Sequence, residues 1–154
     1  MSLISQPAVM AVVRDYLNSQ SWHFQEEDKT FTLGMNVKSK LTPVRLRIIC
    51  EEGKFVTYTY SNINAPEDMR FAVMQFITAA NYGMRRGNFE LDQRDGEIRY
   101  KSFMGLGDTL PDVDEVEKAV DIGIIMFRRY GDELMNVIFA GADPIEACKR
   151  AESN

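Results

Sequence analysis

The chain has 154 residues, of which 45% are hydrophobic and 27% charged, and its formal net charge is −5. This composition excludes a largely disordered chain, and the length predicts a single domain over residues 1–154 that buries a sizeable core. The negative net charge argues against a nucleic-acid partner, because such binding depends on lysine and arginine side chains that neutralise phosphates.

The first part of the chain predicts one helix followed by four strands. Hydrophobic residues recur at helical spacing from Gln6 to Ser19, which is typical of an amphipathic helix. Alternating or β-branched residues then predict four strands, at residues 22–25, 31–37, 44–51 and 54–60. Short polar segments separate these strands, so we expect a consecutive antiparallel meander with one face on the core.

The next helix is predicted over residues 64–85 and is hydrophobic on two sides. Asn64, Pro66 and Glu67 form a strong helix start, in which Asn64 acts as the N-cap. One hydrophobic stripe faces the core. The second stripe consists of Phe71, Met74, Thr78 and Tyr82. Either the terminal helices or a second subunit must cover this second stripe, and we expect it to be the contact of a homodimer.

The remainder of the chain predicts a hairpin and two helical regions. Two short hydrophobic runs on either side of Asp95-Gly96 predict the hairpin, because glycine suits a turn position with positive φ. A long helical region starts near Asp112, and Asp143-Pro144 starts a short final helix. One unbroken helix over residues 109–139 would be on the order of 45 Å long, so we expect a bend near Gly131.

Together these elements predict an α+β fold: a twisted antiparallel sheet, made of a meander plus a hairpin, with helices packed on one face. The order is one helix, four strands, one helix, two strands and two helices, which is similar to the type III secretion chaperone-like fold. Asn81, Gly87–Asp92 and Asp95–Tyr100 resemble the core signature of the YbjN family, which is named for a suspected role in bacterial sensory transduction. The segment Tyr130–Ala147 resembles the end of the same family.

The resemblance covers the chain from about Trp22 onward. It implies a bacterial cytosolic binding or regulatory module that is dimeric, and it carries over neither an enzymatic activity nor catalytic residues. Secretion chaperones of similar fold hold extended segments of partner proteins on their surface, so the analogy of fold implies a chaperone-like role.

The sequence contains no constellation typical of catalysis or metal binding. His23, the only histidine, is predicted to face solvent, and the acids at residues 26–28 lack the spaced oxygen ligands of a calcium loop. Cys50 and Cys148 lack the spacing of a disulfide framework, and we expect them to be reduced, buried thiols. We therefore expect no enzymatic activity, no metal and no cofactor.

The outward positions of the strands are the candidate binding site. Two cations alternate with core residues in one strand, and two cations and an aromatic residue do so in the hairpin: Arg45, Arg47, Arg99, Lys101 and Phe103. If they share one face, with Thr57 and Thr59 nearby, the arginines would pair with carboxylates of an acidic peptide. The alternative is that these side chains simply face water on the exposed side of an antiparallel sheet.

We therefore expect a non-enzymatic protein- or peptide-binding module with a chaperone-like or regulatory role, acting as a homodimer. The N-terminus lacks the pattern of a signal peptide and no hydrophobic run approaches membrane-spanning length, so we expect a cytoplasmic protein without a membrane partner. The alternative function is a regulatory domain that senses a small molecule in a pocket between the sheet and the helices.

Overall fold

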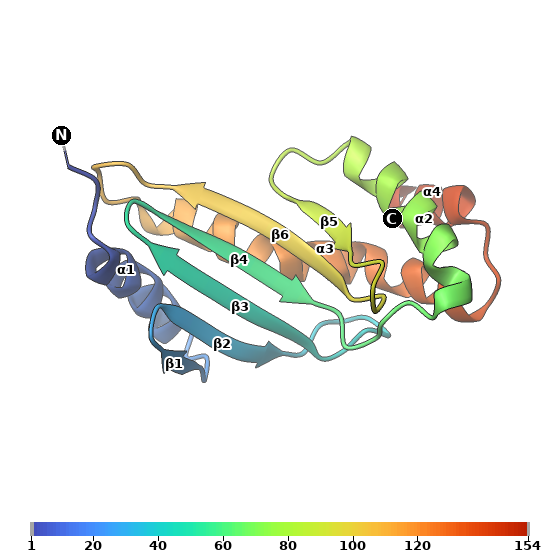
Figure 1. The fold of residues 1–154 in the computed structure, drawn as a ribbon, viewed down its shortest axis with the longest axis horizontal. Coiled ribbons are helices and arrows are strands. Elements are labelled where there is room, and N and C mark those ends of the chain that lie inside the picture. The colour runs from blue at the N-terminus through green and yellow to red at the C-terminus, as the bar shows by residue number, and fades with distance from the viewer. Residues whose placement is uncertain (1, 154) are drawn as a thin grey trace.

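The computed structural model describes residues 2–153, which form a six-stranded antiparallel sheet and four α-helices (Figure 1). The first five elements are α1 (Gln6–Ser19), β1 (Gln25–Glu27), β2 (Thr30–Met35), β3 (Val44–Glu51) and β4 (Lys54–Tyr60). The others are a 3-10 turn (Glu67–Met69), α2 (Arg70–Tyr82), β5 (Asn88–Leu91), β6 (Ile98–Gly105), α3 (Val113–Phe139) and α4 (Pro144–Ser153). The predicted α+β fold and order of elements are confirmed.

The strands lie in the order β1-β2-β3-β4-β6-β5, and all neighbours are antiparallel. The first four strands form the predicted meander. The chain then leaves the sheet through α2, returns at the edge as β5, and folds back as β6 between β5 and β4. The first strand lies later than predicted, at Gln25–Glu27, because the tight turn that follows it is centred on Asp28, whose φ is +52°.

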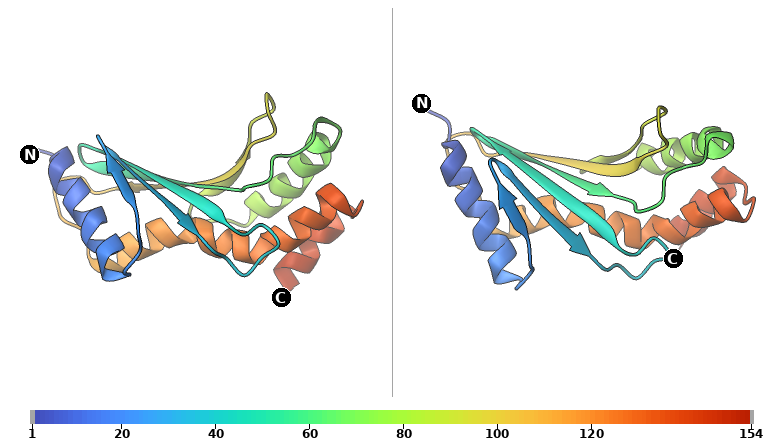
Figure 2. Two further views of the ribbon diagram at one scale, coloured as in Figure 1. Left: turned by 90° about the horizontal axis from the view of Figure 1, so that it is seen from below. Right: turned by 60° about the horizontal axis from the view of Figure 1, so that its bottom comes forward.

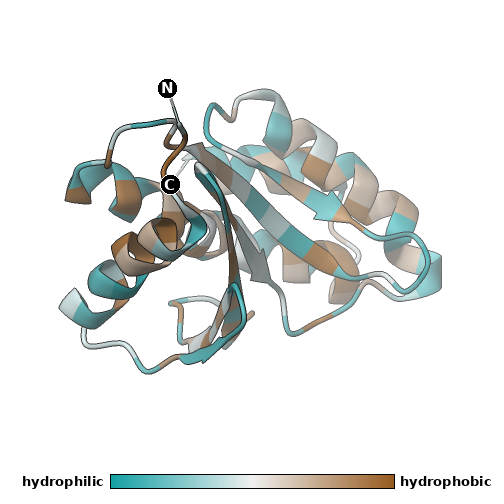
Figure 3. Ribbon diagram, turned by 60° about the vertical axis from the view of Figure 1, so that its left-hand side comes forward, coloured by the Kyte–Doolittle hydropathy of each residue, from teal (hydrophilic) through white to brown (hydrophobic). Residues whose placement is uncertain are grey.

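Helices cover one face of the sheet and leave the other face open. Figure 2 shows α3 running beneath the sheet along its length, with α1 at one end and α2 and α4 together at the other. The strands alternate accordingly: in β3, buried residues facing the helices alternate with more exposed residues on the other side. Figure 3 shows hydrophobic and hydrophilic residues alternating around the helices, as expected for helices with one buried side.

The core lies between the helices and the covered face of the sheet. Val9, Val13 and Leu17 of α1 are fully buried there, in agreement with the predicted helical spacing. Both cysteines are buried and carry free thiols, as predicted. Burial raises the pKa of the Cys50 thiol to about 12 and that of the Cys148 thiol to about 12, so both are protonated and unreactive near neutral pH.

Helix α3 is a single 27-residue helix, so the predicted bend at Gly131 is wrong. It begins at the Asp112 cap, whose carboxylate accepts a hydrogen bond from the Glu115 N–H at 2.9 Å. Gly131 lies inside the helix, where a Cβ atom would approach the Ser39 hydroxyl oxygen to 2.3 Å. The glycine therefore allows close packing of a loop on the helix and does not interrupt it.

The start of α2 also differs from the prediction. The helix begins at Arg70 after a 3-10 turn and ends at Tyr82, and Gly83 follows it. Asn64 does not cap this helix, because its side-chain amide instead donates to the Asp95 carbonyl at 3.4 Å. The asparagine is therefore used to connect the chain before α2 to the β5–β6 turn.

No helix within residues 2–153 is both long enough and apolar enough to cross a membrane.

Candidate functional site

The strand register places the five predicted binding residues on the open face of the sheet. Arg45 on β3 and Arg99 on β6 both lie opposite Tyr60 of the intervening strand β4. Arg47 and Lys101 both lie opposite the neighbouring Tyr58. One further pair continues the pattern, with Phe103 lying opposite Val56. Because side chains directly opposite each other share a face, the predicted grouping of these residues on one side is correct. Whether they bind a partner stays a prediction.

Thr57 and Thr59 do not belong to this face, so their predicted position is wrong. Both point toward the helices and are buried, together with Ser102 on the neighbouring strand. Their three hydroxyl oxygens have no hydrogen-bond partner within the described residues. The large side chains of β4, Tyr58 and Tyr60, take the open face instead.

The two tyrosines form an aromatic strip with a guanidinium group over each ring. Their rings lie 6.2 Å apart, centroid to centroid. The Arg45 guanidinium carbon lies 4.8 Å from the Tyr60 ring centroid, and that of Arg99 lies 4.2 Å from the Tyr58 centroid. Both distances are within the range of cation–π attraction, so the tyrosines hold these arginines close to the surface of the sheet.

The two cations on β6 share one carboxylate of the chain, which offsets one of their two positive charges. Glu90 on β5 accepts hydrogen bonds from Arg99 Nε and from Lys101 Nζ, each at 2.9 Å. Burial alone would raise the pKa of the Glu90 carboxyl, but the hydrogen bonds from Lys101 and Arg99 outweigh it and lower that pKa. Glu90 is therefore ionised near neutral pH, and Arg99 and Lys101 are less available to a partner than their sequence positions indicate.

The cations on β3 remain without such a neighbour. Arg45 and Arg47 are exposed, and neither forms an ion pair with a carboxylate of residues 2–153. The strand beyond them presents Gly34 opposite Arg45 and Thr32 opposite Arg47. The side of the open face formed by β2 and β3 therefore carries positive charge that the chain itself does not neutralise.

A hollow of about 730 Å³ lies over this part of the face. The polar side chains along it come from β1 to β4 and from the segments that follow β4 and precede β6: His23, Gln25, Thr32, Arg45, Tyr60, Ser61, Asn62, Asn64 and Glu97. His23 is exposed, as the strand pattern predicted. The lining offers many hydrogen-bond donors, which suits the binding of a polar partner.

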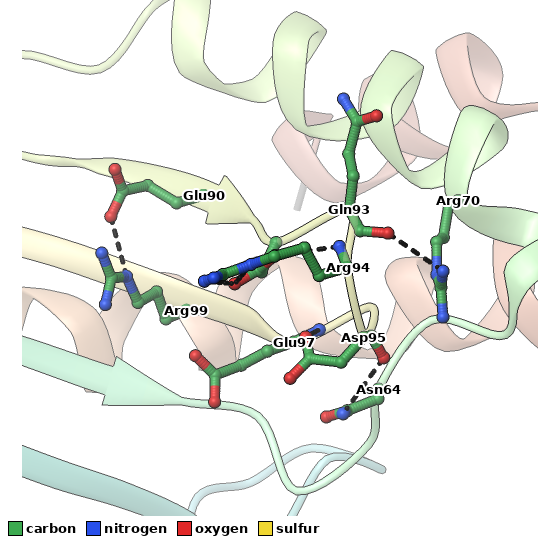
Figure 4. Close-up of polar contacts among 9 residues, drawn as sticks. Asn64, Arg70, Glu90, Gln93, Arg94, Asp95, Glu97 and Arg99 are labelled. Carbon is green, nitrogen blue, oxygen red and sulfur yellow. Dashed lines mark hydrogen bonds and ion pairs between the residues drawn. The ribbon is translucent and has the colours of Figure 1, made fainter.

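The far end of the face is anchored by the β5–β6 turn (Figure 4). Arg70 donates to the Gln93 carbonyl at 3.0 Å, and the Asn64 amide donates to the Asp95 carbonyl. Figure 4 also shows Arg99 directed toward Glu90 on the neighbouring strand. These contacts connect the hairpin to the segment before α2 and hold the register that brings Arg99 beside Glu90.

The free edge of β5 is blocked by a side chain. The Asn81 amide accepts from the Phe89 N–H at 2.8 Å and donates to the Phe89 carbonyl at 2.9 Å. A single asparagine thus satisfies both peptide groups that an added strand would use at this position. A partner can consequently bind more easily on the face of the sheet than by adding a strand at the β5 edge.

The second stripe of α2 is not covered within residues 2–153. The helix buries four residues against the core, Val73, Phe76, Ile77 and Ala80. On the other side, Phe71 is 70% exposed and Tyr82 is 96% exposed, while Thr78 is exposed and Met74 half-buried. The terminal helices therefore leave the predicted dimer stripe free, and the dimer contact stays a prediction.

A smaller pocket of about 390 Å³ lies between the sheet and the helices. Met84, Ile122 and Met126 line it, with Tyr100 from β6 and Arg129 from α3. Its volume is at the lower end of the range for small-molecule sites. Within residues 2–153, no group of three or more histidine, cysteine or acidic side chains is placed to hold a metal ion.

Sequence reasoning missed Gly34, Tyr58, Tyr60 and Glu90 as parts of the open face. The alternation in β4 contained the signal for the tyrosines, but it was interpreted in the opposite phase, which placed Thr57 and Thr59 near the open face. The roles of Gly34 and Glu90 depend on which strands pair and in which register, which strand patterns do not specify.

Comparisons with known proteins agree with this fold. A family model, YbjN, described as "Putative bacterial sensory transduction regulator", matches residues 10–135. The structure is similar to the crystal structure of E. coli YbjN, described as "a putative transcription regulator", with a TM-score of 0.53, 14% sequence identity, and coverage of 97% of this chain and 96% of that chain. At this identity the similarity shows a shared fold. No curated protein matches the chain. Because the family match extends over most of the sequence, this protein belongs to the YbjN family.

Proposed function

We propose that this protein is a non-enzymatic regulatory module that binds an extended, acidic segment of a partner protein on the open face of its sheet, and that it acts as a cytoplasmic homodimer. The observation that carries the proposal is the pair Arg45 and Arg47, two exposed guanidinium groups on the uncovered face of the sheet, without a carboxylate partner among residues 2–153. Guanidinium groups match carboxylates with two parallel hydrogen bonds, so an acidic segment is the complementary occupant.

The neighbouring aromatic residues support the same occupant. Phe103 is 62% exposed on the open face, and the tyrosine strip lies between it and the free arginines. An extended segment that alternates acidic and hydrophobic residues can place carboxylates over the arginines and a hydrophobic side chain on Phe103. The chain has a net charge of −5, so an acidic partner is attracted only by this local positive area, which favours recognition of one orientation.

Charge reversal at the two arginines tests the binding face. The Arg45→Glu and Arg47→Glu double variant should lose binding of a fluorescein-labelled peptide of alternating glutamate and leucine, which the wild type binds in the low-micromolar range. Fluorescence anisotropy measures this, and circular dichroism verifies that the variant folds. Lys38→Glu with Arg128→Glu changes the net charge equally at exposed positions off the face, and should leave binding intact. Equal affinity of the wild type and the Arg45/Arg47 variant would remove the face from the proposal.

The dimer is assigned to the second stripe of α2. The four residues of this stripe, Phe71, Met74, Thr78 and Tyr82, carry no charge, so the same stripe of a second copy can pack against it around a two-fold axis. We expect sedimentation equilibrium at tens of micromolar protein to give a dimer. Phe71→Glu with Tyr82→Glu should give a monomer that keeps its circular dichroism spectrum, because both side chains are exposed. A wild type that sediments as a monomer would contradict this assignment.

The second candidate function is sensing of a small molecule in the pocket lined by Met84, Ile122 and Met126. The pocket lies between the sheet and the helices, where a small-molecule site was predicted. Its methionine side chains can adapt to ligands of different shape. Its small volume makes it the weaker candidate. Filling it with Met126→Trp should leave acidic-peptide binding unchanged if the open face is the functional site.

A further inference from the structure

We propose that the part of the open face over Gly34, beside Arg45 and Arg47, is a subsite for one carboxylate of the partner segment, supplied by an aspartate or glutamate side chain. This inference rests on the proposed function, because it specifies which chemical group of the partner enters which part of the open face. It is carried by a comparison of the two sides of the same sheet.

The β5–β6 side already contains the arrangement that the subsite would form. Glu90 lies opposite Arg99, and Lys101 is the cation two residues further along β6. The two oxygens of its carboxylate divide between these cations, Oε1 to Arg99 and Oε2 to Lys101, each at 2.9 Å. One carboxylate at this position therefore pairs with two cations on the neighbouring strand and offsets one of their two charges.

The β2–β3 side has two cations at the corresponding positions, both of them arginines, without the carboxylate. Gly34 lies opposite Arg45, and Arg47 is again the cation two residues further along its strand. Both pairs of strands are antiparallel, and all six positions lie on the open face. Gly34 thus occupies on β2 the position that Glu90 occupies on β5. The position that corresponds to the Glu90 carboxylate is therefore occupied by a glycine, which has no side chain.

The space over Gly34 is empty. A Cβ atom built on this glycine meets no other atom within 4 Å, and the glycine is part of the lining of the 730 Å³ hollow. Its backbone lies in a regular strand without positive φ, so the absence of a side chain is not required by the backbone. A carboxylate from a partner can therefore reach Arg45 without displacing a residue of this chain.

The surrounding charges favour one carboxylate rather than several. Arg45 is already held over the Tyr60 ring, so its side chain loses less conformational entropy when it binds a carboxylate. Glu97 lies along the same hollow and repels a second anion. The guanidinium fork matches the geometry of a carboxylate, so either arginine can donate two parallel hydrogen bonds to it.

The inference is tested with a small dicarboxylate and with a variant that places a carboxylate side chain at residue 34. Glutarate should shift the NMR signals of the Gly34 amide and of the Arg45 and Arg47 Nε–H groups in a saturable manner, whereas the neutral glutaramide should not. Sulfate should shift them less, because it lacks the planar pair of oxygens. Absence of glutarate shifts at these three residues, or equal shifts with sulfate, would overturn the carboxylate subsite.

The Gly34→Glu variant reproduces Glu90 on the other side of the sheet. Its carboxylate should occupy the subsite and lower the affinity for the alternating glutamate–leucine peptide by about tenfold, because two charge-assisted contacts are lost to the partner. Asn18→Glu adds the same charge on the exposed surface of α1 and should leave that affinity unchanged. Full peptide affinity in Gly34→Glu would also overturn the subsite.

The outcomes separate this inference from the proposed function. Peptide binding that needs Arg45 and Arg47 but tolerates Gly34→Glu would keep the open face and remove the subsite. Glutarate shifts at Gly34, Arg45 and Arg47 without any peptide binding would keep the subsite and remove the open face as a protein-binding site. Circular dichroism and thermal unfolding of Gly34→Glu verify that the fold is retained.

Discussion

Replacing Phe89 with alanine should lower the free energy of unfolding by about 4 kcal/mol, because it removes a large aromatic ring from the core. Phe89 is 2% exposed, and its ring makes edge-to-face contacts with three aromatic rings. The centroid distances are 5.0 Å to Tyr100, 5.3 Å to Phe127 and 5.8 Å to Tyr130. Urea unfolding followed by circular dichroism measures the loss.

The effect should be large because Phe89 connects three elements. Its strand, β5, is only four residues long and lies at the edge of the sheet, so the ring supplies much of the contact between this strand and α3. Loss of β5 would also remove Glu90 from Arg99 and Lys101. Phe103→Ala, at an exposed position on the next strand, is the matched control and should change stability by about 0.5 kcal/mol or less. A similar loss of unfolding free energy for both variants would contradict the role of Phe89 in connecting β5 to the core.

The Gly123→Ala variant should be destabilised by about 2 kcal/mol, although alanine is the better helix former by about 1 kcal/mol. A Cβ atom at this position in α3 would lie 2.1 Å from the Thr59 hydroxyl oxygen and 2.7 Å from its Cβ atom. Both partners are in regular elements, so α3 must move away from the sheet to relieve the overlap. Thermal or urea unfolding of the variant measures the cost.

Two further variants distinguish overpacking from a general effect of the substitution. Gly83→Ala, at the end of α2, meets no atom within 4 Å and should be close to neutral. Adding Thr59→Ala to Gly123→Ala removes the closest contact and an unpaired buried hydroxyl, and should recover part of the stability. If the double variant is no more stable than Gly123→Ala, contact with the Thr59 hydroxyl is not the cause.

The same close approach explains why the sequence interpretation of β4 was wrong. Because α3 approaches β4 closely at Gly123, only a small side chain such as Thr59 fits between them, although Tyr100 is buried opposite it on β6. Tyr58 and Tyr60 are thereby left on the open face, where they hold Arg99 and Arg45. Hydrophobicity alone ranks tyrosine above threonine for burial, and the volume available under the sheet reverses this order.

Most of the open face was nevertheless predictable from local patterns. In β3 and β6 the polar residues alternate with strongly hydrophobic ones, so the outward direction of Arg45, Arg47, Arg99 and Lys101 follows from the two-residue period alone. Their relation to Glu90 and Gly34 does not follow from it. The pairing of Glu90 with two of the cations, and the empty position beside the other two, depend on the register of strands that are separated in the sequence.

The sequence by itself determined the type and order of the elements, since hydrophobic periodicity and turn residues act within a few residues of each other. It also determined which stripe of α2 remains outside the core. Only the tertiary structure decided that α3 is unbroken, that the threonines of β4 and not its tyrosines face the helices, and that Arg45 and Arg47 lack the carboxylate that Arg99 and Lys101 possess. The physical reason is that steric fit between layers and pairing between strands are properties of residues brought together from distant parts of the chain.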